Sequence, residues 1–140
     1  MKISAVFIAV LCLAAFANST SVEDVERMVL EENNLKGEWI VKASFFSDKT
    51  GSRDNNLYDG KLYYAELSKD PKKRDFTALG NLKFGQALRV TYKGKSVIAY
   101  KGDVGSGGPQ LPAIDLHINL AKALNFDLNK GIDYVKLELI

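Results

Sequence analysis

The chain has 140 residues, 46% of them hydrophobic, with 19 basic and 17 acidic side chains. This length fits one domain with one core. The charge balance argues against nucleic acid or an acidic polymer as the main partner, because phosphate binding needs a concentrated basic face. The single basic run, at 69–74, is interrupted by Asp70 and Pro71 and followed by Asp75, so we interpret it as a solvated loop.

Residues 1–17 have the layout of a cleavable secretory signal: Lys2, an apolar run at 3–16 and a small-residue site that ends at Ala17. The run is shorter than the ~20 residues that cross a bilayer, so we expect no membrane anchor. Cys12 is the one cysteine and lies in this leader, so the mature chain should contain no disulfide. The sequence therefore predicts a secreted protein, or a periplasmic one if the source is bacterial.

Residues 18–37 predict an N-terminal helical arm. An amphipathic pattern covers 21–35, with Ser21 as a candidate N-cap and acidic residues in the first turn. Two interpretations stay open. The helix docks on the domain that follows, or it serves as a propeptide or partner-binding arm.

Residues 38–140 predict a β-rich domain. Strand patterns occupy 39–46 and 62–67, separated by a polar loop at 47–59. Alternation over 88–100 predicts a hairpin with its turn at 93–95, and the same alternation returns at 135–139.

The stretch 97–124 holds the strongest candidates for a site. An apolar strand at 97–100 is followed by glycines that are expected to break it, and a helical pattern covers 116–124. Asp103 then opens a glycine-rich loop, where a carboxylate can act as a general acid or bind a sugar hydroxyl, or can accept backbone amides and organise the loop. Asp115 precedes the helix, so it is expected to be an N-cap, with or without a contact to ligand.

The order of several short motifs resembles the double-psi β-barrel of the rare-lipoprotein-A proteins and, more distantly, of expansins and family-45 glycoside hydrolases. In chain order the motifs are ASFF at 43–46, TA with LKFG at 77–85, LRV at 88–90, GD with a glycine loop at 102–109, IDL at 114–116 and VKLE at 135–138. The resemblance implies a six-stranded double-psi β-barrel over 38–140, with one short helix after Asp115.

Departures from the resembled families bear on catalysis. The members that cleave peptidoglycan carry a histidine just after the TA motif, whereas 77–81 reads TALGN here. Val104 replaces the arginine of the loop motif, and Ser47 stands where the hydrolases place a second catalytic aspartate, with Asp48 one step further. The resemblance gives Asp115 the place of the hydrolases' general acid. Expansins also lack the second carboxylate, so the pattern favours a non-hydrolytic protein.

Asp103 and Asp115 are the candidate catalytic residues, and we expect no cofactor. His117 is the one histidine, which excludes a histidine-rich metal site, and it is expected to be an exposed or half-buried helix residue. Aromatic side chains at 45, 46, 58, 63 and 64 offer stacking faces for sugar rings, although most are expected in the core. The predicted ligand-binding residues are Asp103, Gly105, Gly107, Asp115, His117, Tyr63 and Tyr64.

The sequence therefore predicts a secreted monomer that binds cell-wall polysaccharide or another glycan without hydrolysing it. Two alternatives stay open. One is a lytic transglycosylase or glycoside hydrolase that acts on peptidoglycan or β-glucan. The other is an effector, toxin or inhibitor that uses the barrel as a scaffold for protein interaction, because a fold alone does not fix a function.

Overall fold

The computed structural model describes residues 21–69, 79–107 and 111–140. The predicted leader, Cys12, the TA pair at 77–78 and most of the basic run fall outside these residues. The chain divides into two compact units, 1–37 and 38–140. In the first unit, helix α2 (Val22–Lys36) begins after Ser21, whose hydroxyl accepts a hydrogen bond from the backbone N–H of Asp24 at 3.1 Å.

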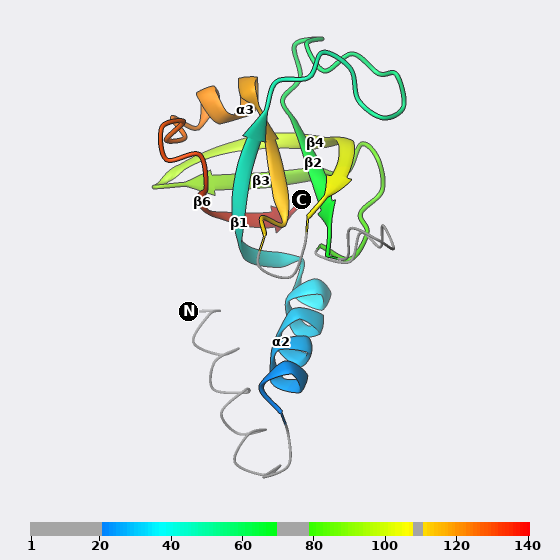
Figure 1. The fold of residues 1–140 in the computed structure, drawn as a ribbon, viewed down its shortest axis with the longest axis vertical. Helices are drawn as coiled ribbons and strands as arrows, with labels where there is room; N and C mark the ends of the chain where they lie inside the picture. The colour runs from blue at the N-terminus through cyan, green and yellow to red at the C-terminus, as the bar shows by residue number, and fades with distance from the viewer. Residues whose placement is uncertain (1–20, 70–78, 108–110) are drawn as a thin grey trace. The chain divides into compact units, whose positions relative to one another are not determined.

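The second unit is a closed barrel whose strands follow one another in the order β1, β5, β2, β4, β3, β6 (Figure 1). Two pairs are parallel, β1 with β5 and β2 with β4, and the other four are antiparallel. The prediction of a mainly β, six-stranded barrel is confirmed. The strands are β1 (Glu38–Phe46), β2 (Tyr63–Ser68), β3 (Ala87–Tyr92), β4 (Lys95–Ser106), β5 (Ile114–His117) and β6 (Asp133–Leu139).

Alternation along the strands fills the barrel. Most side chains that point inward are apolar and almost wholly buried, as the pattern at 135–139 predicted for Val135 and Leu137, while Leu139 at the end of β6 is 40% exposed. The inward set includes Trp39, Ala43, Tyr64, Leu88, Val90, Leu116, Val135 and Leu137.

Strands β3 and β4 form the predicted hairpin, with a tighter turn than expected. Tyr92 pairs with Lys95, so Lys95 belongs to the strand and the loop contains two residues. Lys93 and Gly94 both have positive φ, 45° and 84°, the geometry that matches the twist of paired strands.

Strand β4 does not end at the glycines as predicted; it runs through them to Ser106. A Cβ atom on Gly102 would lie 2.6 Å from Cδ1 of Tyr63, and one on Gly105 would lie 2.7 Å from Cδ2 of Leu67. These glycines therefore let β2 side chains pack closely on β4 instead of breaking the strand. The register shifts at Gly102, which makes a β-bulge there.

An ion pair lies inside the barrel. Glu66 and Lys101 are buried, and Nζ of Lys101 lies 3.0 Å from Oε1 of Glu66. The same carboxylate accepts backbone N–H groups from Leu79, Asn81 and Leu82 at 3.3, 3.0 and 2.8 Å. Glu66 thus fixes the segment that leads into β3.

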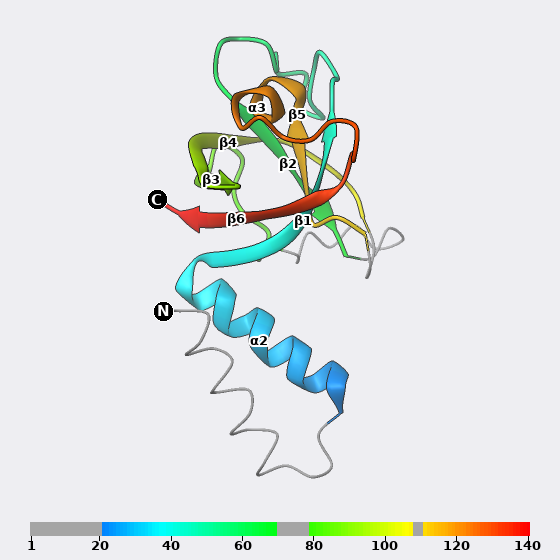
Figure 2. The same cartoon turned by 90° about the vertical axis from the view of Figure 1, so that its left-hand side faces the viewer.

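Helix α3 (Ile118–Ala123) and the loop between β1 and β2 lie at the same end of the barrel (Figures 1 and 2). The helix packs on the ends of β5, β1, β2 and β4. It begins two residues later than the helical pattern predicted, because β5 continues to His117. This end of the barrel carries the residues described next.

Candidate functional site

A row of four paired residues crosses the outward face of the barrel wall, and we call it the outer row: Ser44, Asp115, Ala65 and Asp103. Ala65 and Asp103 are buried in it, at 3% and 9% exposure. Ser44 pairs with Asp115 between β1 and β5, Asp115 with Ala65 between β5 and β2, and Ala65 with Asp103 between β2 and β4. Paired residues point to the same side of a sheet. The register therefore brings the two aspartates to one face, on either side of a small alanine.

Asp115 is not the N-cap that the sequence predicted, because it lies inside strand β5. Its Oδ1 accepts a hydrogen bond from the hydroxyl of Ser44 at 2.9 Å. Burial raises the pKa of Asp115 to about 6, the hydrogen bond from Ser44 opposes this rise, and the negative charges of Asp48 and Asp103 add to it. A carboxyl group with this pKa changes its charge in mildly acidic solution.

His117 is the N-cap of α3, and its side chain is fully buried instead of exposed or half-buried. Its Nδ1 accepts from the backbone N–H of Asn119 at 3.4 Å, and Nε2 lies 3.1 Å from the carbonyl oxygen of Asp48. The neutral tautomer with its proton on Nε2 satisfies both contacts. His117 therefore ties the loop that follows β1 to the start of the helix.

An aromatic group surrounds this histidine. The rings of Phe46 and Tyr58 meet the imidazole edge-on, with centroids 5.3 and 4.5 Å away. The Tyr58 side chain is 44% exposed, and its hydroxyl donates to the carbonyl of Ser47 at 3.0 Å. Tyr58 thus offers a supported, solvent-facing ring near Asp115, which lies two residues before His117 on β5.

The two tyrosines predicted to bind ligand have different environments. Tyr64 is wholly buried inside the barrel, where its hydroxyl donates to the carbonyl of Gln86 at 3.0 Å. It therefore presents no face to a ligand. Tyr63 points outward and donates to Oδ2 of Asp59 at 2.6 Å; burial and this carboxylate raise the pKa of Tyr63 to about 12.

Asp103 lies within β4 instead of opening a loop, and its side chain is 9% exposed. Its Oδ1 accepts the backbone N–H groups of Ser52 and Val104, both at 2.8 Å. The amide of Asn55 also bonds to the carbonyl of Gly102 at 2.9 Å. These contacts hold the β1–β2 loop on strand β4, as the loop-organising interpretation of Asp103 requires.

The two glycines predicted to contact ligand have packing roles. Gly105 lies against Leu67, and a Cβ on Gly107 would lie 2.6 Å from the carbonyl oxygen of Ser68. Backbone therefore approaches backbone at Gly107. These glycines therefore allow β4, the strand that carries Asp103, to pack closely on β2.

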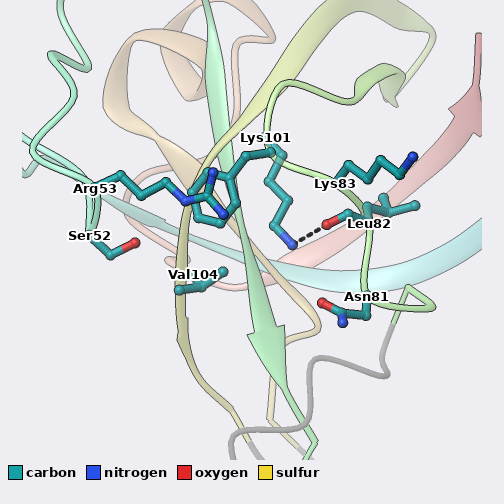
Figure 3. Close-up of a pocket in the computed structure, with 8 residues that line it drawn as sticks. Ser52, Arg53, Asn81, Leu82, Lys83, Lys101 and Val104 are labelled. Atoms are coloured by element: carbon teal, nitrogen blue, oxygen red, sulfur yellow. Dashed lines mark hydrogen bonds between the residues drawn. The ribbon is translucent and has the colours of Figure 1, made fainter.

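A cleft of about 600 Å³ opens beside Ser52 (Figure 3), whose backbone N–H donates to Asp103. Over it the guanidinium of Arg53 lies 3.7 Å from the centre of the Phe84 ring. No local sequence pattern predicts this cleft, because Arg53 and Phe84 lie far apart in the chain. Its lining residues are Ser52, Arg53, Asn81, Leu82, Lys83, Phe84, Lys101 and Val104.

Within the described ranges, no three histidine, cysteine or carboxylate side chains are grouped as a metal ion would need. In the same part of the chain, no helix combines the length and the apolar character needed to cross a bilayer.

No protein-family model and no curated protein matches the sequence. Solved structures do. An apo expansin from Clavibacter michiganensis is 19% identical with a TM-score of 0.54, and a d78n mutant of that expansin in complex with cellohexaose is 18% identical with the same score. Both matches cover 74% of this chain and 50% of the other, so the chain spans about half the length of these expansins. A Streptomyces papain inhibitor matches at 17% identity, 74% and 94% coverage and a TM-score of 0.49.

Proposed function

We propose that the protein, whose barrel has the expansin-like double-psi fold that the motifs implied, is exported and binds a polysaccharide without hydrolysing it. The sugar chain lies along the outer row, with a ring stacked on Tyr58 and hydroxyl groups bonded to Asp115.

The environment of Asp115 carries this proposal. Its carboxylate is half-buried on an outward face, and within the described residues it has one hydrogen-bond partner, Ser44, and no cation. A carboxylate in this state keeps unused acceptor sites, which sugar hydroxyls can fill. The exposed ring of Tyr58 supplies the apolar face that a pyranose ring needs. The cellohexaose complex of the Clavibacter expansin agrees with a sugar ligand for this fold.

Binding without hydrolysis is favoured by the state of the second carboxylate. Glycoside hydrolysis uses two carboxyl groups, one as acid and one as base or nucleophile. Here Oδ1 of Asp103 already accepts two backbone N–H groups and holds a loop in place. Asp103 is thus committed to holding the loop and is not poised for the second role.

One observation favours an enzyme as the second candidate. A pKa of about 6 is the property that lets a buried carboxyl group act as a general acid near neutral pH. In that case Asp115 donates a proton to the leaving oxygen of a peptidoglycan or β-glucan chain.

A sedimentation assay on insoluble cell-wall polymers tests the proposal. The protein is mixed with cellulose, β-glucan, chitin or peptidoglycan, and both the pelleted protein and the released soluble sugar are measured. We expect pelleting without release on at least one polymer. Asp115→Asn and Tyr58→Ala should each weaken pelleting about tenfold, the equivalent of about 1.4 kcal/mol.

Matched controls separate the site from general surface effects. Tyr134→Ala removes a tyrosine from β6 that is more exposed than Tyr58, 57% against 44%, and Asp127→Asn removes an exposed carboxylate from the loop before β6. Both should pellet like the unaltered protein. Release of sugar that Asp115→Asn abolishes would establish the enzyme instead, and no pelleting on any polymer would leave the protein-interaction scaffold.

A further inference from the structure

The cleft beside Arg53 has the features of an anion-binding site. None of its eight lining residues is acidic, and three are cationic. One of these, Lys101, is already engaged by Glu66 and by the carbonyl of Leu82. Lys83 extends away from Arg53 (Figure 3). Arg53 is therefore the cation that the cleft itself presents.

Arg53 is held in place without being neutralised. Its guanidinium carbon lies 3.7 Å from the centre of the Phe84 ring. This cation–π contact limits the conformations that the Arg53 side chain can adopt. In the described part of the chain no carboxylate forms an ion pair with it. Stacking covers the face of a guanidinium but leaves the N–H groups at its edge, and these match both oxygens of a carboxylate.

Neutral donors border the same space. The side chains of Ser52 and Asn81 line the cleft together with Arg53 (Figure 3). The backbone of Ser52 is fixed by its bond to Asp103, and that of Asn81 by its bond to Glu66. A hydroxyl and an amide on anchored backbone can bond to sugar hydroxyl groups on either side of a carboxylate.

The cleft and the outer row are bordered by the same loop. One loop, between β1 and β2, places Tyr58 over His117 and Arg53 over Phe84, and Asp103 of the outer row bonds to Ser52 at the cleft's edge. A glycan that extends from the outer row past the contact between Asp103 and Ser52 would meet the cleft.

We propose that this cleft is a subsite for a uronic acid, so that the protein recognises a polysaccharide with carboxylated sugars. This inference rests on the proposed function, because it assumes a glycan on the outer row. Arg53 takes the carboxylate, while Ser52 and Asn81 take neighbouring hydroxyls. The whole chain is nearly neutral, so it has no strongly basic surface that would attract a polyanion in general. Recognition through one specific contact with a carboxylate agrees with this charge.

Calorimetric titration with oligogalacturonate tests the subsite, with the methyl-esterified oligomer as the matched ligand. Esterification keeps the sugar rings and removes the negative charge, so we expect it to weaken binding at least tenfold. Arg53→Gln should weaken oligogalacturonate binding by a similar factor. Arg89→Gln, which removes the same charge from the exposed outer face of β3, should leave the affinity unchanged. Arg53→Lys should recover only part of the loss, because lysine keeps the charge but not the fork.

Several results would overturn the subsite. Equal affinity for the acidic and esterified oligomers would do so, as would equal losses in Arg53→Gln and Arg89→Gln. An acidic peptide that competes with the same dependence on Arg53 would show that the cleft takes protein carboxylates. If neutral polymers still sediment the protein in these cases, the proposed function stands and only the subsite falls; if no polysaccharide binds, both fall.

Discussion

Strand β2 borders two kinds of carboxylate, one inside the barrel and one outside, and they differ in how many hydrogen-bond and charge partners they have. Glu66 points into the barrel, where one ammonium and three backbone N–H groups bond to it. Its neighbour Ala65 points outward between Asp103 and Asp115, and Asp115 has the hydroxyl of Ser44 as its described partner. The inner carboxylate is fully compensated, whereas the outer one is half-buried and has no cation beside it among the described residues.

The difference separates structure from function. A buried charge persists only where partners replace its hydration, so the contacts of Glu66 are those of a residue that holds the fold. A partly buried carboxylate without a cation weakens the fold, and groups of this kind concentrate where a ligand supplies the missing contacts. This contrast predicts large stability losses for changes inside and a gain in stability for the right change outside.

Lys101→Met should produce the largest loss of stability. It leaves the carboxylate of Glu66 buried without its cation, and breaking a buried pair in this way costs about 3–5 kcal/mol. The free energy of unfolding, measured in urea at pH 7, checks this prediction.

The double variant Glu66→Gln/Lys101→Met provides the control. It removes both charges and keeps a side chain whose oxygen can still accept backbone N–H groups, so it should recover a large part of the loss. A double variant that is as unstable as the sum of both single variants would mean that the two side chains act independently.

His117→Ala should have the next largest effect. It empties a fully buried position between Phe46 and Tyr58 and removes the cap of α3, which together cost about 2–4 kcal/mol. His117→Asn keeps a side-chain acceptor for the helix N–H group and should be about 1 kcal/mol less harmful. Thermal melts of both variants test this order. Equal losses of stability would mean that the cap at His117 contributes nothing measurable.

Asp115→Asn should stabilise the protein. The folded pKa is about 6 against an ordinary value of 3.8, so between these pH values the folded state binds more protons than the unfolded state. The free energy of unfolding therefore falls as pH rises from about 4 to 6 and stays low above that. Asparagine can accept the Ser44 hydrogen bond without a charge, so we expect a gain of about 1–2 kcal/mol at pH 7, after allowing for partial exposure, and none below pH 4.

Ser44→Ala is the companion variant for this pH profile. It removes the one hydrogen bond that lowers the pKa of Asp115, so the fall in stability should extend to a higher pH. Unfolding curves at pH 4, 5, 6, 7 and 8 resolve the shift. Profiles of Asp115→Asn and the unaltered protein that stay parallel across this range would contradict the raised pKa.

The barrel was predictable because its information is local and repeated. Alternation at 88–92 and 135–139 fixes the inward faces, and the ordered motifs between 43 and 138 imply the topology. The glycines misled the prediction because the same residue serves turns and close packing. Nothing in the sequence says that Tyr63 and Leu67 lie against Gly102 and Gly105.

The site was predictable in its residues and less so in their roles. Asp103 and Asp115 stand out beside the glycines, but their places inside strands depend on where β4 and β5 end. His117 became the N-cap because the strand pairing of β5 with β1 extends to it and takes Asp115 out of the helix. The contact of Arg53 with Phe84 has no local signal, since it depends on how a loop folds over the end of the barrel.

A matched pair of tyrosine variants gives the smallest expected effect and the sharpest contrast between inside and outside. Tyr58→Phe removes an exposed hydroxyl whose acceptor, the carbonyl of Ser47, can bond to water instead, so the loss should stay below about 0.5 kcal/mol. Tyr64→Phe removes a buried hydroxyl, and the carbonyl of Gln86 keeps the backbone N–H of Lys101 as a donor, so the loss should be that of one net hydrogen bond, about 0.5–1.5 kcal/mol. Both variants keep the ring, so polysaccharide sedimentation should be unchanged in each while their urea midpoints differ. Equal midpoints would mean that the inner hydroxyl contributes no more to stability than the outer one, and a loss of sedimentation in Tyr58→Phe would assign the hydroxyl, and not the ring, to the ligand.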